Sequence, residues 1–345
     1  MRQCPCAQHG RLTYLAGLYA YHSNETSDLA FGPFSLGRNQ RSSGDYAAFL
    51  NADYALSQHF TLSAGVRYDD NTQRNYATST FTSPLTQERS QKAVLPRYSV
   101  TYKPSDKVDI YGLVSRGYHA GGFNGATAPQ PTYQSEFIWN YEIGVKGSFW
   151  DHRIQTQMDA FYLDWSHQQL NQTINVRQGV GISQITNAGE SRISGEEAAL
   201  QWAVSDSLDV DASLTFLDSK YKAYQDTVIA PRFGLNPDLN GKRLPFSPRA
   251  AGSLSVQYLA SLPVGGGTWK ARLRADVRYT DSRFFDPTDL LEASAYWLTN
   301  LYAGVQNERY EIGVYADNVF NQGYLTGGFL PDGVFPPEVE LGQPR

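Results

Sequence analysis

The sequence predicts an all-β protein, and more specifically an antiparallel transmembrane β-barrel. Three observations support this prediction. Segments of about ten residues alternate in polarity, the connections between them alternate between short and long, and the composition is unusual. Aromatic residues make up 13% of the chain and charged residues only 18%. Soluble domains typically carry about a quarter of charged residues, so this balance favours strands that face lipid.

The segment Trp269–Tyr279, "WKARLRADVRY", shows the alternation most clearly. Side chains of an extended chain point to opposite faces in turn, so its apolar residues fall on one face and its charged residues on the other. On a helix the same charges would encircle the axis. The pattern recurs in about thirteen segments, which include 12–22, 45–54, 60–68, 137–149, 153–163, 208–216, 251–258 and 309–318.

The connections between these segments fall into two length classes. Short ones occupy 56–59, 103–106, 149–153, 204–207 and 306–309, with a slightly longer one at 260–268. Long ones lie between them at 23–43, 70–90, 119–135, 166–190, 219–243 and 281–294. Outer-membrane barrels have tight turns on the periplasmic side and long loops outside, whereas β-sandwiches and propellers do not sort their connections in this way.

Aromatic residues bracket several apolar stripes, as the two interfacial girdles of a membrane barrel require. The bracketing pairs are Trp269 and Tyr279, Phe137 and Phe149, and Tyr46 and Tyr54. The opposite, polar face is expected to line a lumen. A sheet in lipid must close, and bacterial single-chain barrels have even strand numbers, so thirteen strands predict part of a larger barrel.

Composition and motifs argue against several other classes of protein. No apolar run approaches the roughly 20 residues of a membrane helix, and the net charge of −5 provides no basic field for nucleic acid. Cys4 and Cys6 lack a second pair of ligands, so we expect no metal site and no cofactor. Hydrolase, zinc-protease and P-loop motifs are absent, so we expect no enzyme and no catalytic residues, although a strand-borne serine and histidine stay possible.

The glycine-rich segment Val114–Gly125, "VSRGYHAGGFNG", has the composition of a phosphate-binding loop. A dinucleotide-binding loop needs a helix after its glycines, whereas Pro129 and Pro131 follow here, and then another strand. We therefore expect a strand end, at which Gly121 and Gly122 allow the chain to turn into a long external loop.

A small set of residues is expected to line a ligand site. Arginines on the lumen face would attract an anionic ligand, or would instead pair with acidic residues of neighbouring strands. Residues near the barrel mouth would contact a ligand or pack within their own loops. The candidates are Arg116, Tyr118, His119, Tyr133, Arg272, Arg274 and Arg278.

Four segments, in order along the chain, resemble motifs of TonB-dependent outer-membrane receptors. Residues 114–124 are similar to the family's strand-end motif Tyr-Ser-Arg-Gly-Phe-Lys-Ala-Gly-Gly-Phe-Asn, and 140–165 resemble the hairpin that follows it. Residues 187–202 resemble an Asn-Ala-Gly…Gly-x-Glu strand, and 315–324 resemble an Asn-Leu-Phe-Asn-x-x-Tyr motif near the carboxyl end. The resemblance covers residues 11 to about 329 and is specific to the barrel.

The resemblance implies an active importer in the outer membrane of a Gram-negative bacterium. Its barrel of about 22 strands would surround a plug domain and contact outer-membrane lipid. Its long loops would capture a ferric siderophore or a similarly scarce nutrient, and the TonB complex would supply energy. No nucleic-acid partner is expected.

The two ends depart from the family pattern. Residues 1–10 look non-native or unstructured and carry no signal peptide, and 11–345 are expected to form a partial barrel domain without the plug, the TonB-contacting segment or the first strands. The final "LGQPR" lacks an aromatic carboxyl terminus. We expect such a fragment not to transport alone. A passive diffusion channel and a soluble β-rich binding protein are the alternatives, and the ligand is not identified by sequence.

Overall fold

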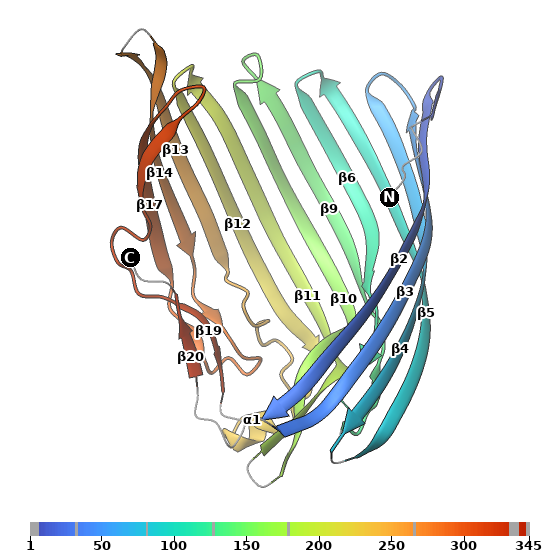
Figure 1. The fold of residues 1–345 in the computed structure, drawn as a ribbon. Coiled ribbons are helices and arrows are strands. Elements are labelled where there is room, and N and C mark those ends of the chain that lie inside the picture. Colours follow the sequence, from blue (N-terminus) through green and yellow to red (C-terminus); the bar gives the residue numbers. More distant parts are fainter. Residues whose placement is uncertain are drawn as a thin grey trace.

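The computed structural model describes residues 7–31, 34–80, 82–125, 128–177, 180–264, 267–330 and 338–342. They form one large antiparallel sheet that curves into an open trough, as Figure 1 shows. Each long strand pairs with the next long strand along the chain, so the sheet has no crossovers. The predicted all-β antiparallel fold is confirmed, and within the described residues the sheet is a part of a barrel.

The main sheet contains 14 strands in the described part of the chain. All but the three-residue β1 belong to the predicted set of about thirteen. The strands are β1 (Ala7–His9), β2 (Leu12–Phe31), β3 (Phe34–Ala55), β4 (Phe60–Ser79), β5 (Thr82–Ser105), β6 (Val108–His119), β9 (Glu136–Phe149), β10 (Ile154–Arg177), β11 (Val180–Ser205), β12 (Leu208–Ala223), β13 (Ala250–Val264), β14 (Gly267–Thr280), β17 (Tyr296–Gln306) and β18 (Glu311–Ala316).

The connections contain three further strand pairs and one short helix. The pairs are β7 (Gly122–Phe123) with β8 (Thr132–Tyr133), β15 (Arg283–Phe284) with β16 (Glu292–Ala293), and β19 (Leu325–Phe329) with β20 (Glu338–Leu341); the helix is α1 (Ile229–Arg232). The short connections are tight turns, as predicted. They lie at the end of the sheet opposite to α1 (Figure 1).

The first ten residues are more ordered than the sequence suggested. Ala7–His9 pair with β2, where Ala7 lies opposite Tyr14 and His9 opposite Leu12. The expectation that residues 1–10 are unstructured is therefore wrong for this stretch, because a tight turn at 10–11 folds it onto the edge of the sheet. Cys4 and Cys6 lie outside the described residues.

Three of the predicted long loops are β-ribbons instead. β2 and β3 pair as far as Phe31 and Phe34, and β10 and β11 pair as far as Arg177 and Val180. β4 and β5 continue in the same way through most of 70–90. These ribbons were not predicted, because both of their faces are polar and their sequences therefore do not alternate in polarity. They form nevertheless, because backbone pairing satisfies the donors and acceptors of a strand in any solvent.

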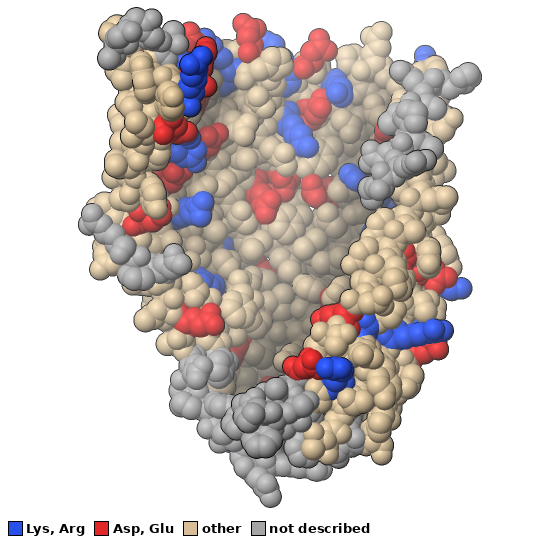
Figure 2. All heavy atoms as spheres, viewed as in Figure 1, with Lys and Arg blue, Asp and Glu red and all other residues tan. Residues whose placement is uncertain are grey.

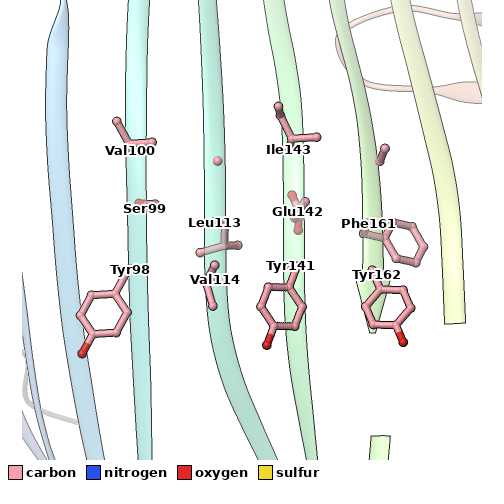
Figure 3. Close-up of a pocket in the computed structure, with 12 residues that line it drawn as sticks. Tyr98, Ser99, Val100, Leu113, Val114, Tyr141, Glu142, Ile143, Phe161 and Tyr162 are labelled. Atoms are coloured by element: carbon pink, nitrogen blue, oxygen red, sulfur yellow. The ribbon is translucent and has the colours of Figure 1, made fainter. Parts of the chain in front are cut away.

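The convex face of the sheet is apolar and bordered by aromatic side chains. Tyr98, Tyr141 and Tyr162 lie in one row across β5, β9 and β10 (Figure 3). On β9 the apolar stripe runs from Tyr141 to Phe149, which at about 3.3 Å per residue is roughly 26 Å, comparable with the ~25 Å band of outer-membrane barrels. The predicted apolar face is confirmed on this strand, whereas its contact with lipid and the girdle role of Phe137 stay predictions.

The concave face is polar. Figure 2 looks into the hollow and shows Lys, Arg, Asp and Glu side chains distributed along it. Two examples are the Tyr111 hydroxyl, which donates to Glu142 at 2.7 Å, and the Arg67 guanidinium, which donates to Asp69. The side-chain alternation of each strand therefore separates lipid from lumen, as the sequence predicts.

Candidate functional site

The concave face carries a polar depression across β11 to β14. Arg274 lies within it and donates to Asp276 twice, from Nε at 2.9 Å and from Nη2 at 2.8 Å. This arginine is therefore paired with an acidic residue of its own strand, rather than of a neighbouring strand as the second alternative expected. The lining includes Asp211, Ser213, Ser253, Ser255, Arg274, Asp276 and Arg278.

Arg272 and Arg278 lie on the same face of β14 as Arg274. Arg272 Nε donates to Gln257 Oε1 at 2.8 Å, and its guanidinium carbon lies 5.3 Å from the centre of the Tyr302 ring. In the described part of the chain Arg278 makes no hydrogen bond or ion pair. The structure thus brings the three predicted arginines together on one face of β14, where Arg278 lies within electrostatic range of Asp276.

The second candidate surface is the loop 120–135, which joins β6 to β9 at the ribbon end of the sheet. The Gly121 N–H donates to Gln91 Oε1 at 2.7 Å, and Gln91 Nε2 donates to the Gly121 carbonyl at 3.1 Å. On the other side, the Asn124 side chain donates to the Ile185 carbonyl and accepts from the Ile185 N–H. The loop is thereby fixed to β5 and to β11.

Gly121 and Gly122 fulfil a different role from the expected one. Neither has a positive φ, so neither supplies a left-handed turn. A Cβ on Gly121 would lie 2.2 Å from the Tyr133 carbonyl oxygen, and one on Gly122 would lie 2.4 Å from the Tyr133 hydroxyl. Glycine is required at 121, because backbone atoms of the other arm of the loop approach it closely, whereas at 122 only the end of the Tyr133 side chain is near.

His119 and Tyr133 lie together in this region, as the sequence predicts for residues near the mouth. His119 Nδ1 lies 3.3 Å from Glu136 Oε1, and Glu136 Oε2 accepts from the Gln169 N–H at 2.6 Å. Tyr133 pairs with Gly122 through β7 and β8. These two candidates form one group at the loop, separate from the arginines of β14.

Two arginines that sequence reasoning missed flank this loop. Arg41 on β3 lies opposite Asn75 of β4, and Arg89 on β5 lies opposite Gln73 of β4. Arg41 Nη2 donates to the Phe123 carbonyl at 3.5 Å, whereas Arg89 has no hydrogen-bond or ion-pair partner within the described residues. Burial lowers the pKa of the Arg89 guanidinium from its ordinary value. Both lie in ribbon segments that were expected to be loops.

Arg116 and Tyr118 form a third group, on the last residues of β6. Arg116 is paired in register with Trp139, two residues beyond the pair of Val114 and Tyr141, so its side chain emerges on the convex face. Its guanidinium carbon lies 4.0 Å from the centre of the Phe137 ring, and the rings of Phe137 and Tyr118 stack at 6.0 Å. The Tyr118 hydroxyl also lies within electrostatic range of Asp69 and Asp45 of the concave face, so this group reaches from the end of β6 towards the polar interior.

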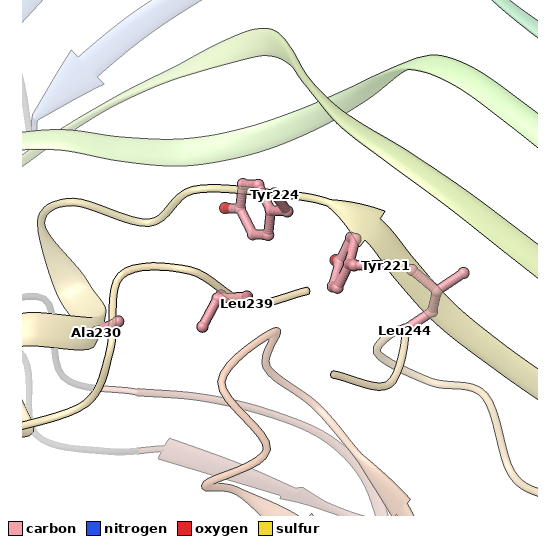
Figure 4. Close-up of a cluster of buried hydrophobic side chains, with 5 residues drawn as sticks. All are labelled: Tyr221, Tyr224, Ala230, Leu239 and Leu244. Atoms are coloured by element: carbon pink, nitrogen blue, oxygen red, sulfur yellow. The ribbon is translucent and has the colours of Figure 1, made fainter. Parts of the chain in front are cut away.

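The loops after β12 and β14 build a compact layer at the same end of the sheet. Tyr221 and Tyr224 at the end of β12 pack with the α1 region, their ring centres 4.9 Å apart (Figure 4). Asp226 accepts from the N–H groups of Val228 and Ile229 and so orients the start of α1. The buried residues of this cluster are Tyr221, Tyr224, Ala230, Leu239 and Leu244.

Burial in this loop layer changes the titration of several groups. It raises the pKa values of Tyr221 and Tyr224, because their phenolates would be desolvated. It also raises the pKa of the Asp289 carboxyl, although Lys242 Nζ lies 3.6 Å away and opposes the shift. The layer is therefore closely packed.

The described residues contain no group of three or more His, Cys, Asp or Glu side chains that would hold a metal ion. Within the same residues, no helix is long and apolar enough to cross a membrane. The features that the structure does place together are the polar hollow, the clamped loop 120–135 and the packed loop layer beside it.

Comparison with known proteins identifies relatives along nearly the whole chain. The family model described as "TonB dependent receptor-like, beta-barrel" matches residues 8–319. A pesticin receptor of Yersinia enterocolitica is 24% identical over 339 residues, which are 95% of this chain and 47% of that receptor. A probable TonB-dependent siderophore receptor, PiuA of Acinetobacter baumannii, is 24% identical over 68% of the chain. The chain thus spans less than half the length of these curated relatives.

Solved structures show the same fold. The ferric yersiniabactin uptake receptor FyuA of Yersinia pestis superimposes with a TM-score of 0.78 at 20% identity, over 97% of this chain and 50% of that one. The siderophore receptor PiuA of Acinetobacter baumannii gives a TM-score of 0.76 at 16% identity, over 98% and 53% of the two chains. Together with the two-faced sheet and its loop end, these matches show that the chain belongs to the TonB-dependent receptor-like β-barrel family.

Proposed function

We propose that the chain is part of an outer-membrane receptor of a Gram-negative bacterium that captures a ferric siderophore or a similar metal chelate for TonB-energised uptake. The proposal depends on one observation. The curved sheet is apolar on its convex face and polar on its concave face, and its ribbons and packed loops lie at one end. This arrangement suits a protein that is fixed in lipid, receives a ligand at its loop end and passes it along a polar interior. The proposed role is binding and translocation, without catalysis.

The charge of the wall favours an anionic ligand. Within the described residues, neither Arg278 in the hollow nor Arg89 beside the loop 120–135 has a carboxylate oxygen within the 4.0 Å of an ion pair, although Asp276 acts on Arg278 at longer range. A guanidinium matches a carboxylate in a bidentate geometry, and metal chelates with carboxylate or phenolate groups commonly carry negative charge. The names of the relatives, which include siderophore receptors, point to the same class of ligand.

Binding to isolated outer membranes tests the proposal. A host without its own siderophore receptors expresses the chain behind a secretion signal, and radioiron-labelled chelates of the catecholate, hydroxamate and carboxylate classes are applied to its outer membranes. We expect saturable binding of at least one anionic chelate. Arg278→Gln and Arg89→Gln should each weaken that binding about tenfold. Arg38→Gln is the control, because Arg38 is paired with Asp28 at 2.6 Å.

Energised uptake is a separate part of the proposal. We propose that the 345 residues alone bind ligand without accumulating it, because strands and a plug from the rest of such a receptor would be needed. Uptake that requires tonB in cells expressing only this chain would contradict that part. Recovery of the folded chain in the soluble fraction without detergent would contradict the receptor role itself.

A further inference from the structure

A buried asparagine in the β4–β5 ribbon leaves one of its side-chain atoms without a partner. Asn75 on β4 is 1% exposed, and its Nδ2 donates to Gln87 Oε1 at 3.1 Å. Gln87 Nε2 in turn donates to the Pro131 carbonyl at 2.9 Å, and a carbonyl can only accept. This order fixes the orientation of both amides. Asn75 Oδ1 is therefore an acceptor, and within the described residues it is buried without a donor.

Two arginines flank Asn75 on the same face of the sheet, where β3, β4 and β5 lie side by side (Figure 1). Arg41 on β3 lies directly opposite Asn75. On the other side, Gln87 of β5 lies opposite Asn75, and Arg89 is two residues farther along β5. Neighbouring strands are about 4.8 Å apart and two residues of a strand cover about 7 Å, so the Cα atoms of the two arginines are roughly 12 Å apart. Their long side chains can therefore meet at one small ligand over β4.

Neither of these arginines has an acidic partner in the described part of the chain. Arg41 makes no ion pair there, and its Nη2 donates to the Phe123 carbonyl at 3.5 Å. Arg89 Nε is buried and makes no hydrogen bond. Burial lowers the pKa of the Arg89 guanidinium, and among the described residues only Tyr133 opposes that shift. Two neighbouring cations beside a buried acceptor therefore lack the anion that would neutralise them.

The loop 120–135 covers this group of side chains from the concave side of the sheet. Asn75 shares the concave face with Asp69, since alternate residues of a strand point the same way. The Phe123 and Pro131 carbonyls, one from each arm of the loop, accept hydrogen bonds from the group, and Phe123 is 4% exposed. The group therefore faces the interior rather than lipid, and a ligand that fits beneath the loop is small.

We propose that Arg41, Arg89 and Asn75 bind inorganic phosphate in its hydrogen phosphate form. The two guanidiniums present planar forks of donors to the phosphate oxygens. The phosphate hydroxyl donates to Asn75 Oδ1, the acceptor that lacks a donor in the described chain. Sulfate has the same tetrahedral shape but carries no proton near neutral pH, so it cannot supply this donor. The site goes beyond the proposed transport role and shares only Arg89 with it.

Phosphate binding to the full 345-residue chain in detergent micelles tests this site, with sulfate as the matched probe. Isothermal titration calorimetry, in a buffer that contains neither ion, measures the two affinities. We expect phosphate to bind saturably and at least tenfold more tightly than sulfate. No phosphate binding, or equal affinity for the two ions, would overturn the proposal. The assay contains no chelate and no TonB, so its outcome is separate from that of the proposed function.

Four variants complete the test. Asn75→Leu removes the buried acceptor and should remove most of the preference for phosphate over sulfate, whereas a general loss of structure would weaken both ions alike. Arg41→Gln should weaken phosphate binding about tenfold, and unchanged affinity in this variant would contradict the site. Arg41→Lys keeps the charge without the fork and should bind phosphate with intermediate affinity, which covers the case in which the glutamine variant does not fold. Arg74→Gln is the control and should change neither affinity, because Arg74 lies on the other face of β4 and pairs with Glu88 at 2.9 Å.

Discussion

Gln91 and Gly121 are joined by two hydrogen bonds across a separation of 30 residues. The Gly121 N–H donates to Gln91 Oε1 at 2.7 Å, and Gln91 Nε2 donates to the Gly121 carbonyl at 3.1 Å. A side-chain amide on β5 thus pairs with the backbone of the loop 120–135 in the way that a neighbouring strand would. Because Gln91 is 8% exposed, both bonds are shielded from water, and the loop depends on them.

Replacing Gln91 with leucine should release the loop. The substitution keeps the size of the side chain but leaves the Gly121 carbonyl without this partner and its N–H with only the 3.4 Å bond to Ser135 Oγ, at a cost of about 1–3 kcal/mol for each buried group left unpaired. We expect protease cleavage within 120–135 to accelerate at least tenfold in the folded protein, as measured by mass spectrometry of the fragments. Gln73→Leu is the control, because Gln73 donates only to Asn71 of its own strand. Equal cleavage of the two variants would contradict this account of the loop.

Alanine at Gly121 should prevent the loop from closing. Its Cβ would lie 2.2 Å from the Tyr133 carbonyl oxygen and 2.7 Å from the Gln134 carbonyl carbon, and backbone atoms cannot move aside as a side chain would. Gly125→Ala is a matched control in the same loop, since a Cβ there meets nothing within 4 Å. Protease cleavage within 120–135, followed by mass spectrometry of the fragments, should accelerate only for Gly121→Ala. A native-like loop in that variant would refute the close-approach role.

The membrane-spanning parts of the fold were predictable because lipid and water impose opposite demands on the two faces of a strand. In Trp269–Tyr279 the alternation identified both the strand and the face of its arginines, and the structure confirms both. The ribbons at 23–43 and 166–190 gave no such signal, since both of their faces carry polar side chains. These strands form because their backbones pair with a neighbouring strand, and the sequence of one segment does not show which segment will pair with it.

The same physics explains which site residues were found. Arg278 was found because its strand alternates clearly. Arg89 was missed because it lies in a ribbon that was predicted as a loop, and its position beside Tyr133 depends on the pairing of β4 with β5. Arg116 was recognised through its motif, but the face on which it lies follows from its register with Trp139. Because alternate residues of a strand share a face, counting by twos from Val114 would have placed Arg116 on the same face as Val114.

A charge in the middle of the convex face should impair membrane insertion. Met158 is 56% exposed and lies on β10 midway between Ile154 and Tyr162. Met158→Arg should destabilise the protein folded in lipid vesicles by about 2–4 kcal/mol, which is the cost of an arginine near the bilayer midplane. Gln157→Arg, one residue away, faces the polar hollow beside Asp159 and should change it by less than about 1 kcal/mol. Equal effects in a denaturant titration would contradict the assignment of the two faces.

The stability of the loop layer should fall as pH rises above the ordinary range of a carboxyl. Burial holds the pKa of Asp289 above its usual 3.8, so the folded loop binds a proton that the unfolded loop has already released. Between those two pKa values the folded state carries more protons, and its stability therefore decreases with increasing pH.

Thermal unfolding of the loop layer, followed by protease susceptibility of 281–294, should show this decline from about pH 4 upward. Asp289→Asn should flatten the profile, because an amide does not ionise, while Lys242→Gln should steepen it by removing the cation 3.6 Å from the carboxylate. A profile unchanged by Asp289→Asn would show that another group governs the layer.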